Sequence, residues 1–282
     1  MQVTPRIIRS AWRGARRVSF LLAGTSIVAG AQHVARPPRL NSAQPERPTV
    51  STHAGTVSAG WFEIETGFEL DRGHDPEHNT LGTFAAKLGV AENVQLSMLA
   101  AYVRPSDNGG GFSDLTFGVK TRLLEGNPVL GDFAVQPNLK LPTGSADKGS
   151  GTNTTDGTLL LISSRDFYGM DLDLNVAYTF RGGSGIRAPR DQWLWAASLG
   201  GDLSHGAGWA IELYGVPGTS GPKGDLPLVA FLGGPTFTVA ESLVLDLGVI
   251  LPIAGPQPHA FYAGLTYNLG RIWGVREKGV VK

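Results

Sequence analysis

The sequence predicts an all-β protein, a transmembrane antiparallel up-and-down β-barrel of about 12 strands behind an N-terminal signal peptide. Three observations support this fold class. Apolar and polar residues alternate with period two along most of the chain, the alternating segments are long enough to cross a bilayer, and long connections alternate with short ones.

The composition agrees with β structure and excludes several function classes. Glycine accounts for 39 of 282 residues, and charged residues make up 17 % where about 25 % is usual. The 24 Lys and Arg residues balance the 24 Asp and Glu residues, so the chain has no net positive charge that would attract nucleic acid. The absence of cysteine excludes disulfides, thiolate metal sites and cysteine nucleophiles.

Residues 1–31 have the three parts of a secretory signal peptide. A leader with five arginines and no acid precedes an apolar run from Val18 to Ala29, which is too short to span a bilayer. Ala29-Gly30-Ala31 then offers small residues at the two positions that a signal peptidase recognises. Residues 32–56 contain four prolines and are predicted to form an extended or disordered lead-in.

Residues 57–269 are predicted to form the barrel. In Phe62–Leu70, for example, one face carries mainly apolar side chains and the other carries three glutamates, as expected of a strand. Three segments fit less well, because Pro137, Pro227 and Pro235 each remove a backbone donor and Leu159–Ile162 is apolar on both faces. The expected strands cover 57–70, 80–90, 94–104, 114–123, 132–142, 157–167, 170–180, 192–203, 208–216, 226–239, 243–251 and 260–269.

The connections favour a barrel over a soluble sandwich. Long links rich in Gly, Pro, Asp and Ser alternate with tight ones, as in outer-membrane barrels with periplasmic termini. The stretch 124–131 is an exception, because it is a longer link at the end of the barrel where the other links are tight. A soluble sandwich would also alternate, but its strands usually have only about 5–6 residues.

The last strand carries a candidate assembly signal. Gly264, Tyr267 and Leu269 have the Gly-x-x-aromatic-x-apolar spacing that barrel-assembly machinery recognises on a final strand. Residues 270–282 follow as a polar C-terminal tail, which we expect to lie in the periplasm.

The polar faces of the strands predict a charged lumen. Opposed charges across the lumen would tune the passage of polar solutes and ions, or would pair with one another as a polar core. The lumen-lining candidates are Glu63, Glu65, Glu69, Lys87, Asp114, Lys120, Arg122, Lys140, Asp171, Asp173, Glu212 and Asp246, with Asp202 on the same predicted face.

No metal, cofactor or catalytic site is predicted. His74 and His78 in the first long loop would suit a divalent metal, and Thr143–Asp156 would suit calcium, but solvated loops explain both. The sequence contains no Gly-x-Ser-x-Gly elbow, phosphate-binding loop or dinucleotide fingerprint. None of the six histidines is followed two residues later by serine, as in outer-membrane phospholipases, and His74-Asp75 is the only adjacent pair of the kind that barrel proteases use.

Several motifs resemble the family labelled "MetA-pathway of phenol degradation", transporters of the outer-membrane barrel superfamily. The resemblance runs from about Gly60 to Leu269, and it rests on Ser113–Leu123, Leu139–Gly144, Asp156-Gly157 and Asn175–Phe180. It implies an outer-membrane channel or transporter, loosely linked to the uptake of aromatic or other hydrophobic compounds.

The sequence therefore predicts an outer-membrane, porin-like channel for passive or gated passage of small molecules. The alternative is an occluded structural or surface-binding barrel that acts through its outer loops. Its expected partners are outer-membrane lipid, the barrel-assembly machinery and a solute that the sequence does not identify.

Overall fold

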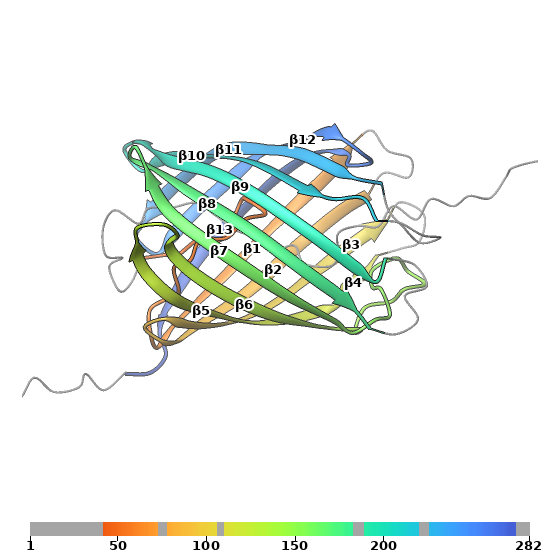
Figure 1. The fold of residues 1–282 in the computed structure, drawn as a ribbon, viewed down its shortest axis with the longest axis horizontal. Coiled ribbons are helices and arrows are strands. Elements are labelled where there is room, and N and C mark those ends of the chain that lie inside the picture. Colours follow the sequence, from red (N-terminus) through yellow and green to blue (C-terminus); the bar gives the residue numbers. More distant parts are fainter. Residues whose placement is uncertain (1–41, 73–77, 106–109, 183–188, 220–225, 275–282) are drawn as a thin grey trace, which may run out of the picture.

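The computed structural model describes residues 42–72, 78–105, 110–182, 189–219 and 226–274. Its strands form one antiparallel sheet that closes on itself, because β1 pairs with β2 on one side and with β13 on the other. Figure 1 shows the strands winding around the barrel at a tilt. The predicted fold class, an all-β antiparallel barrel, is confirmed.

Twelve long strands and one short strand make up the described sheet. The short strand β4 (Gly111–Phe112) pairs only with the outer part of β3. The long strands are β1 (Trp61–Arg72), β2 (His78–Ala91), β3 (Val94–Pro105), β5 (Leu115–Asn127), β6 (Gly131–Leu141), β7 (Asp156–Phe167), β8 (Met170–Arg181), β9 (Asp191–Ser204), β10 (Ala207–Val216), β11 (Leu228–Ala240), β12 (Leu243–Ala254) and β13 (His259–Arg271).

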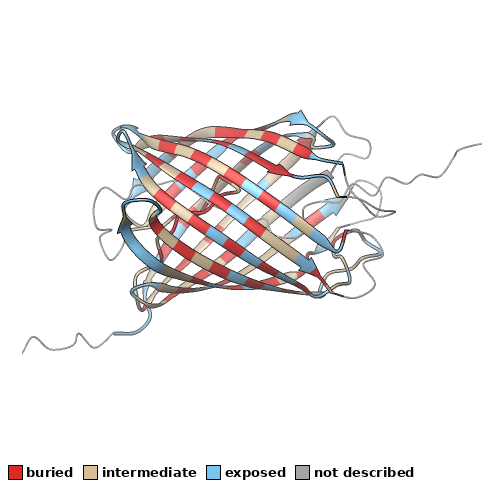
Figure 2. Cartoon of the chain, viewed as in Figure 1, coloured by how far each residue is buried: buried red, intermediate tan, exposed pale blue. Residues whose placement is uncertain are grey.

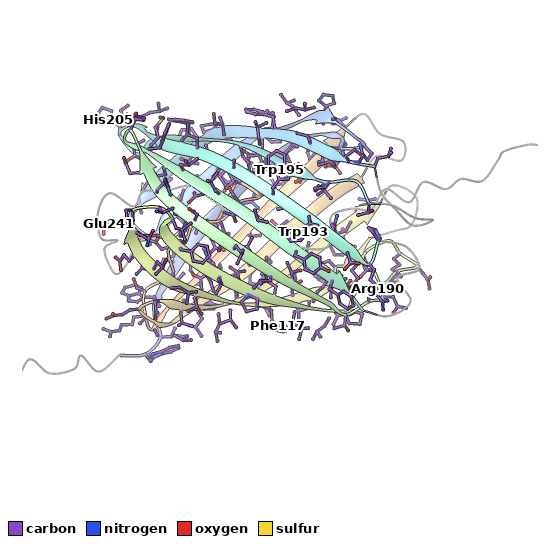
Figure 3. All side chains as sticks on the ribbon, in the orientation of Figure 1. Phe117, Arg190, Trp193, Trp195, His205 and Glu241 are labelled. Atoms are coloured by element: carbon purple, nitrogen blue, oxygen red, sulfur yellow. The ribbon has the colours of Figure 1, made fainter. Side chains whose placement is uncertain are left out.

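Side chains alternate between the lumen and the outer surface. Along β7, Leu160 and Ile162 are buried inside the barrel while Leu159 and Leu161 are exposed outside it. Figure 2 shows this alternation as bands of buried and exposed residues on the strands, and Figure 3 shows Phe117 on the outer face. An apolar outer face of this kind suits the hydrocarbon core of a bilayer, which offers no hydrogen-bond partners to polar groups.

The two ends of the barrel differ in the length of their connections. One end has two-residue turns at 92–93, 168–169, 205–206 and 241–242, and the other carries the longer loops. The short-turn end is the periplasmic end in outer-membrane barrels. The predicted long link at 124–131 is corrected to a turn at 128–130, because register shifts after Arg122 and Leu124 let β5 continue to Asn127.

Two of the prolines within strands, Pro137 and Pro235, lie where the sheet tolerates them. Pro137 pairs with Leu159 on β7, and the ladder to β5 has no pair at this position. Pro235 pairs with Trp209 on β10, and the ladder to β12 has no pair beside it. Each missing N–H therefore faces a gap in the ladder, which explains how proline fits a central strand.

The predicted lead-in 32–56 is described from residue 42 onward, where it is irregular and lies inside the barrel. We call residues 42–57 the plug segment. The first strand begins at Trp61 rather than at 57, and the last strand continues to Arg271, two residues into the predicted tail. The predicted signal peptide 1–31 and tail residues 275–282 lie outside the described residues. The part of the chain that the structure describes contains no helix able to span a membrane.

Close packing between β11 and β12 leads to a stability prediction. A Cβ atom on Gly234 would meet the carbonyl oxygen of Leu247 and lie 2.6 Å from Cα of Gly248, whereas one on Gly157 would meet nothing within 4 Å. We expect Gly234→Ala to lower the free energy of unfolding by about 1–3 kcal/mol, the usual cost of overpacking. Heat-dependent gel mobility will measure this, with Gly157→Ala as the matched control. Equal stability of the two variants would contradict the close packing.

Candidate functional site

The plug segment fills part of the lumen without joining the wall as a strand. Most of its residues from 45 to 57 are buried. Apart from a single bridge position at Thr49, it does not pair with a strand, so most of its buried backbone N–H groups need other acceptors. The wall supplies them as side-chain oxygens.

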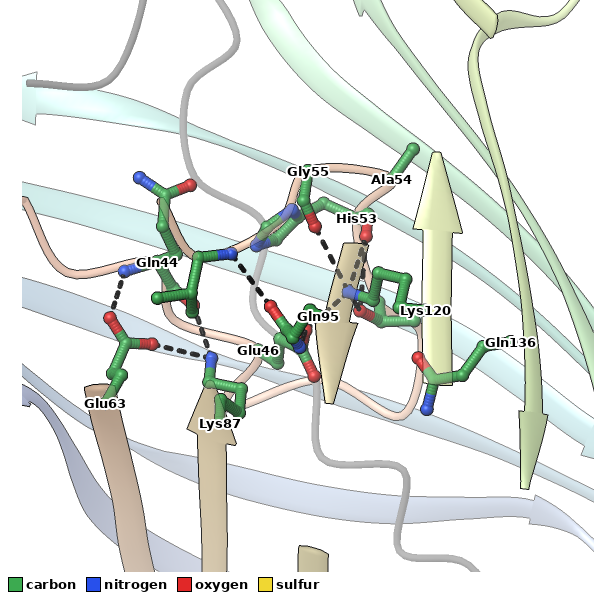
Figure 4. A network of polar contacts seen from close by, with 12 residues as sticks. Gln44, Glu46, His53, Ala54, Gly55, Glu63, Lys87, Gln95, Lys120 and Gln136 are labelled. Carbon is green, nitrogen blue, oxygen red and sulfur yellow. Dashed lines mark hydrogen bonds and ion pairs between the residues drawn. The ribbon is translucent and has the colours of Figure 1, made fainter. Parts of the chain in front are cut away.

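Two acids on β1 accept hydrogen bonds from the start of the plug segment. The Glu63 carboxylate accepts from the backbone N–H of Gln44 at 2.7 Å, and that of Glu65 accepts from the N–H of Glu46 at 2.6 Å. Lys87 on β2 lies 2.7 Å from both wall carboxylates. Figure 4 shows Glu63 between Lys87 and the plug backbone. Each wall acid therefore serves a wall cation and a plug N–H together.

Wall residues on β8 and β10 hold the middle of the plug segment. The two oxygens of Glu212 accept hydrogen bonds from the N–H groups of Val50 and Ser51, each at 2.6 Å. Asn175 forms a reciprocal pair with Thr52, accepting from its N–H and donating to its carbonyl oxygen, both at 2.9 Å. This amide replaces the partner that a neighbouring strand would provide.

The end of the plug segment is fixed on two further strands. Ser164 on β7 accepts a hydrogen bond from the N–H of Ala54 at 2.8 Å and itself contacts Asp173 at 2.5 Å. Gln95 on β3 accepts from the N–H of Val57 at 2.9 Å. The plug segment thus bridges strands from widely separated parts of the wall.

Lys120 on β5 lies in a cage of oxygen atoms. It forms an ion pair with Glu46, and its ammonium donates to the hydroxyl of Thr52 at 2.8 Å and the carbonyl of His53 at 2.9 Å. Gln95 donates to the same carboxylate at 2.9 Å (Figure 4). Lys120 is fully buried, so displacing the plug segment would remove the anion that compensates its charge.

Arg47, the next plug residue, binds another part of the wall. Its guanidinium lies 3.2 Å from Asp246 on β12 and donates to Thr83 on β2 at 2.9 Å. Cβ atoms on Gly67 and Gly264 would collide with this guanidinium, so the two glycines make room for it. Neighbouring plug residues of opposite charge therefore each meet a wall residue of complementary charge.

The plug segment also carries two shifted ionisable groups. Burial by itself raises the pKa of Glu46, but the nearby Lys120 and Lys87 outweigh this and lower the pKa to about 2. Burial, followed by the charge of Lys120, lowers the pKa of His53 to about 3. Glu46 is therefore ionised and His53 neutral in the docked plug at neutral pH.

A second polar network lies toward the long-loop end. Lys140 lies 3.0 Å from Asp114 and 2.8 Å from Asp156, and Arg181 lies 3.6 Å from Asp156. Asp114 also accepts from the N–H and hydroxyl of Thr152, at 2.9 and 2.8 Å. These bonds hold the 142–155 connection against the inner wall.

The structure places the sequence-predicted lumen charges as follows. Glu69 and Arg122 are half-buried, and Asp202 is exposed at the short-turn rim. Arg122 contacts Asp132 at 3.9 Å rather than the plug segment. The remaining ten are buried: Glu63, Glu65, Lys87, Asp114, Lys120, Lys140, Asp171, Asp173, Glu212 and Asp246.

Sequence reasoning missed the residues that dock the plug segment. Glu46, Arg47 and His53 fell in a stretch predicted to be a lead-in, and Gln95 and Ser164 are uncharged. A useful signal was present in the adjacent opposite charges of Glu46 and Arg47, in a chain whose inner faces carry more acids than bases.

The loop positions that were weighed as metal ligands do not form a ligand set within the described residues. No group of three His, Asp or Glu side chains there is placed to hold a metal ion. His74 lies outside the described residues. Asp156 is committed to Lys140 and Arg181.

Together, the closed barrel and the docked segment define an outer-membrane β-barrel with an internal N-terminal plug. The chain belongs to the family described as "Putative MetA-pathway of phenol degradation", whose model matches residues 46–252. This match begins inside the plug segment, so the plug and the wall fall within one family region.

Solved outer-membrane channels share this fold. The COG4313 outer membrane channel from Pseudomonas putida F1 is 16 % identical, with a TM-score of 0.61 over 77 % of this chain and 98 % of that one. The KdgM porin is 13 % identical, with a TM-score of 0.51 over 73 % and 98 % of the two chains. No curated protein sequence matches the chain.

The shifted pKa of His53 predicts that acid loosens the plug segment. His53 has a pKa of about 3 when docked, against about 6.5 when free in solution. The undocked plug therefore binds more protons between these values, and docking weakens as the pH falls through this window. Glu46 adds to the effect between about 4.5 and 2.

We expect channel current in planar bilayers to rise when the pH falls from 7 to 5. His53→Gln should lessen this rise, because it removes a plug group whose protonation in that window weakens docking. His259→Gln, at an exposed strand end, is the control and should keep it. A pH dependence that His53→Gln leaves unchanged would show that another group governs docking.

Proposed function

We propose that the protein is a gated outer-membrane channel for small molecules, closed by the plug segment and opened when the segment leaves its wall contacts. The single observation that carries this proposal is how the plug is held. Seven of its backbone N–H groups, spread from Gln44 to Val57, bond to wall side chains. Its release would therefore leave the ladders of the barrel intact.

We further propose that the solutes are small apolar or aromatic compounds and that they pass without a catalytic step. The description of the family, which refers to phenol degradation, supports this solute class. So does the lumen wall, which includes inward-facing apolar residues such as Leu160, Leu232 and Ile250.

Export and insertion complete the proposal. Residues 1–31 would direct secretion, and barrel-assembly machinery would recognise Gly264, Tyr267 and Leu269 on β13. Tyr267 and Leu269 point outward, with 39 and 50 % of their surfaces exposed, so they are accessible to such a partner. The outer face would then contact outer-membrane lipid.

A disulfide that locks the plug segment tests the gate. The chain has no cysteine of its own, and the N–H of Ala54 lies 2.8 Å from the hydroxyl of Ser164, so Ala54→Cys with Ser164→Cys places two thiols close together. We expect the oxidised double variant to show a large loss of current in planar bilayers and reduction to restore it.

Each single cysteine variant serves as the control and should conduct regardless of redox state. Folded, reduced protein that stays silent under all conditions would contradict the channel. It would favour the alternative, an occluded barrel acting through its outer loops.

A further inference from the structure

The connection between β6 and β7, residues 142–155, folds inward at the long-loop end and is held there by one buried carboxylate. Asp114 accepts hydrogen bonds from the backbone N–H groups of Gly144 at 3.0 Å and Thr152 at 2.9 Å. The Asp114 side chain is fully buried, and Lys140 lies 3.0 Å from it on the inner wall. Because Gly144 and Thr152 lie near opposite ends of the connection, one side chain fixes both of its limbs.

A β-bulge in the wall places Asp114 for this role. In the strand register, two residues of β3 (100–101) face three residues (113–115) where β4 passes into β5. Ser113 and Asp114 are consecutive yet both buried, whereas successive residues of a regular strand point to opposite faces. The extra residue of a bulge re-aims a side chain in this way, and here it turns a carboxylate towards the connection.

The connection packs closely on the bulge. A Cβ atom on Gly151 would lie 2.6 Å from the carbonyl carbon of Gly144 and 2.7 Å from a carboxylate oxygen of Asp114. The hydroxyl of Thr143 accepts a hydrogen bond from the N–H of Leu115, at the bulge, at 2.9 Å. The two limbs of the connection therefore touch each other and the wall, with no space for a side chain at Gly151.

The connection is a folded unit that does not depend on the plug segment. The carbonyl oxygen of Ser145 accepts hydrogen bonds from the N–H groups of Ser150 at 2.9 Å and Gly151 at 3.1 Å, and Ser150 is fully buried. The carbonyl oxygen of Thr155 accepts from the N–H of Gly182, just after β8, at 2.8 Å. These partners, like those of the Asp114 carboxylate, lie outside residues 42–57, so release of the plug segment would leave the connection in place.

We propose that the 142–155 connection is a fixed outer barrier of the lumen, that Asp114 is its latch, and that it limits the size of the solutes that enter once the plug segment has left. Hydrogen bonds to a carboxylate are stronger than neutral ones, and a buried carboxylate that lost them would be costly. Two motifs of the sequence, Ser113–Leu123 and Leu139–Gly144, meet at this latch. The inference rests on the proposed function, since it adds a second barrier to the same lumen.

A cysteine placed beneath the connection tests the barrier without any need for current. Thr158 faces the lumen on β7, two residues from Asp156, and is 6 % exposed. Thr158→Cys gives the chain a single thiol, and its alkylation by iodoacetamide is followed by mass in the full protein in detergent. We expect Asp114→Ala to speed this alkylation at least about tenfold, because loss of the charge-assisted bonds lets the connection open locally.

Matched variants assign the effect to the latch. Asp166→Ala removes an exposed acid at the short-turn end and should leave the alkylation rate of the Thr158→Cys thiol unchanged. Gly151→Ala should speed alkylation as Asp114→Ala does, and it replaces that variant if heat-dependent gel mobility shows that Asp114→Ala does not fold. Alkylation that neither latch variant accelerates would overturn the inference.

Current measurements separate this inference from the channel itself. In planar bilayers at pH 5, Asp114→Ala should raise the unit current above that of the unchanged protein, whereas Asp166→Ala should not. A protein that conducts with the same unit current whether or not the latch is present would overturn the inference and leave the channel standing. A protein that never conducts, but whose Thr158→Cys thiol becomes reactive when the latch is removed, supports the outer barrier and refutes only the channel.

Discussion

The need to satisfy backbone N–H groups inside a closed barrel governs the rest of this structure. The plug segment is irregular apart from one bridge position, and most of it is buried, so most of its donors have neither a neighbouring strand nor water to bond to. Carboxylates on β1 and β10 of the wall accept hydrogen bonds from these donors. Such charge-assisted bonds are stronger than neutral ones, which explains why the inner faces contain more acids than the wall cations require.

This constraint changes the meaning of the lumen charges. In a pore without the plug segment, Lys87 and Lys120 would face acids across open water and would set ion preference. In the closed barrel both cations are instead buried against plug atoms and wall acids. They act first as docking groups, and any selectivity that they confer belongs to the open state.

The sequence predicted the wall well because the wall follows a local rule. Alternation identified Glu63, Lys120 and Asp246 as inward-facing, since period two is a property of each strand alone. It also left Leu159–Ile162 ambiguous, and the structure explains why. Leu160 and Ile162 face an apolar part of the lumen while Leu159 and Leu161 are exposed on the outer surface, so both faces of that strand are apolar.

The plug segment was not predictable in the same way. An extended segment held by side chains has no period, because its partners are spaced by the geometry of the surrounding wall and not by its own backbone. The contacts of Val50 and Ser51 with Glu212 join residues more than 160 positions apart. The prolines of residues 32–56 indicated an extended chain, but nothing local indicated that it turns inward.

The plug segment contacts the apolar part of the lumen wall. Ala54 and Val50 of the plug segment pack against the same apolar cluster that continues toward Ile250 and Tyr262. A solute on that cluster shifts the plug equilibrium only by the difference between its affinities for the closed and open states. Because Ala54 already covers part of the cluster, an apolar solute that needs the covered surface binds the open state more tightly. Opening would then depend on the solute itself, and the polar contacts of the plug would set the affinity difference that the solute must supply.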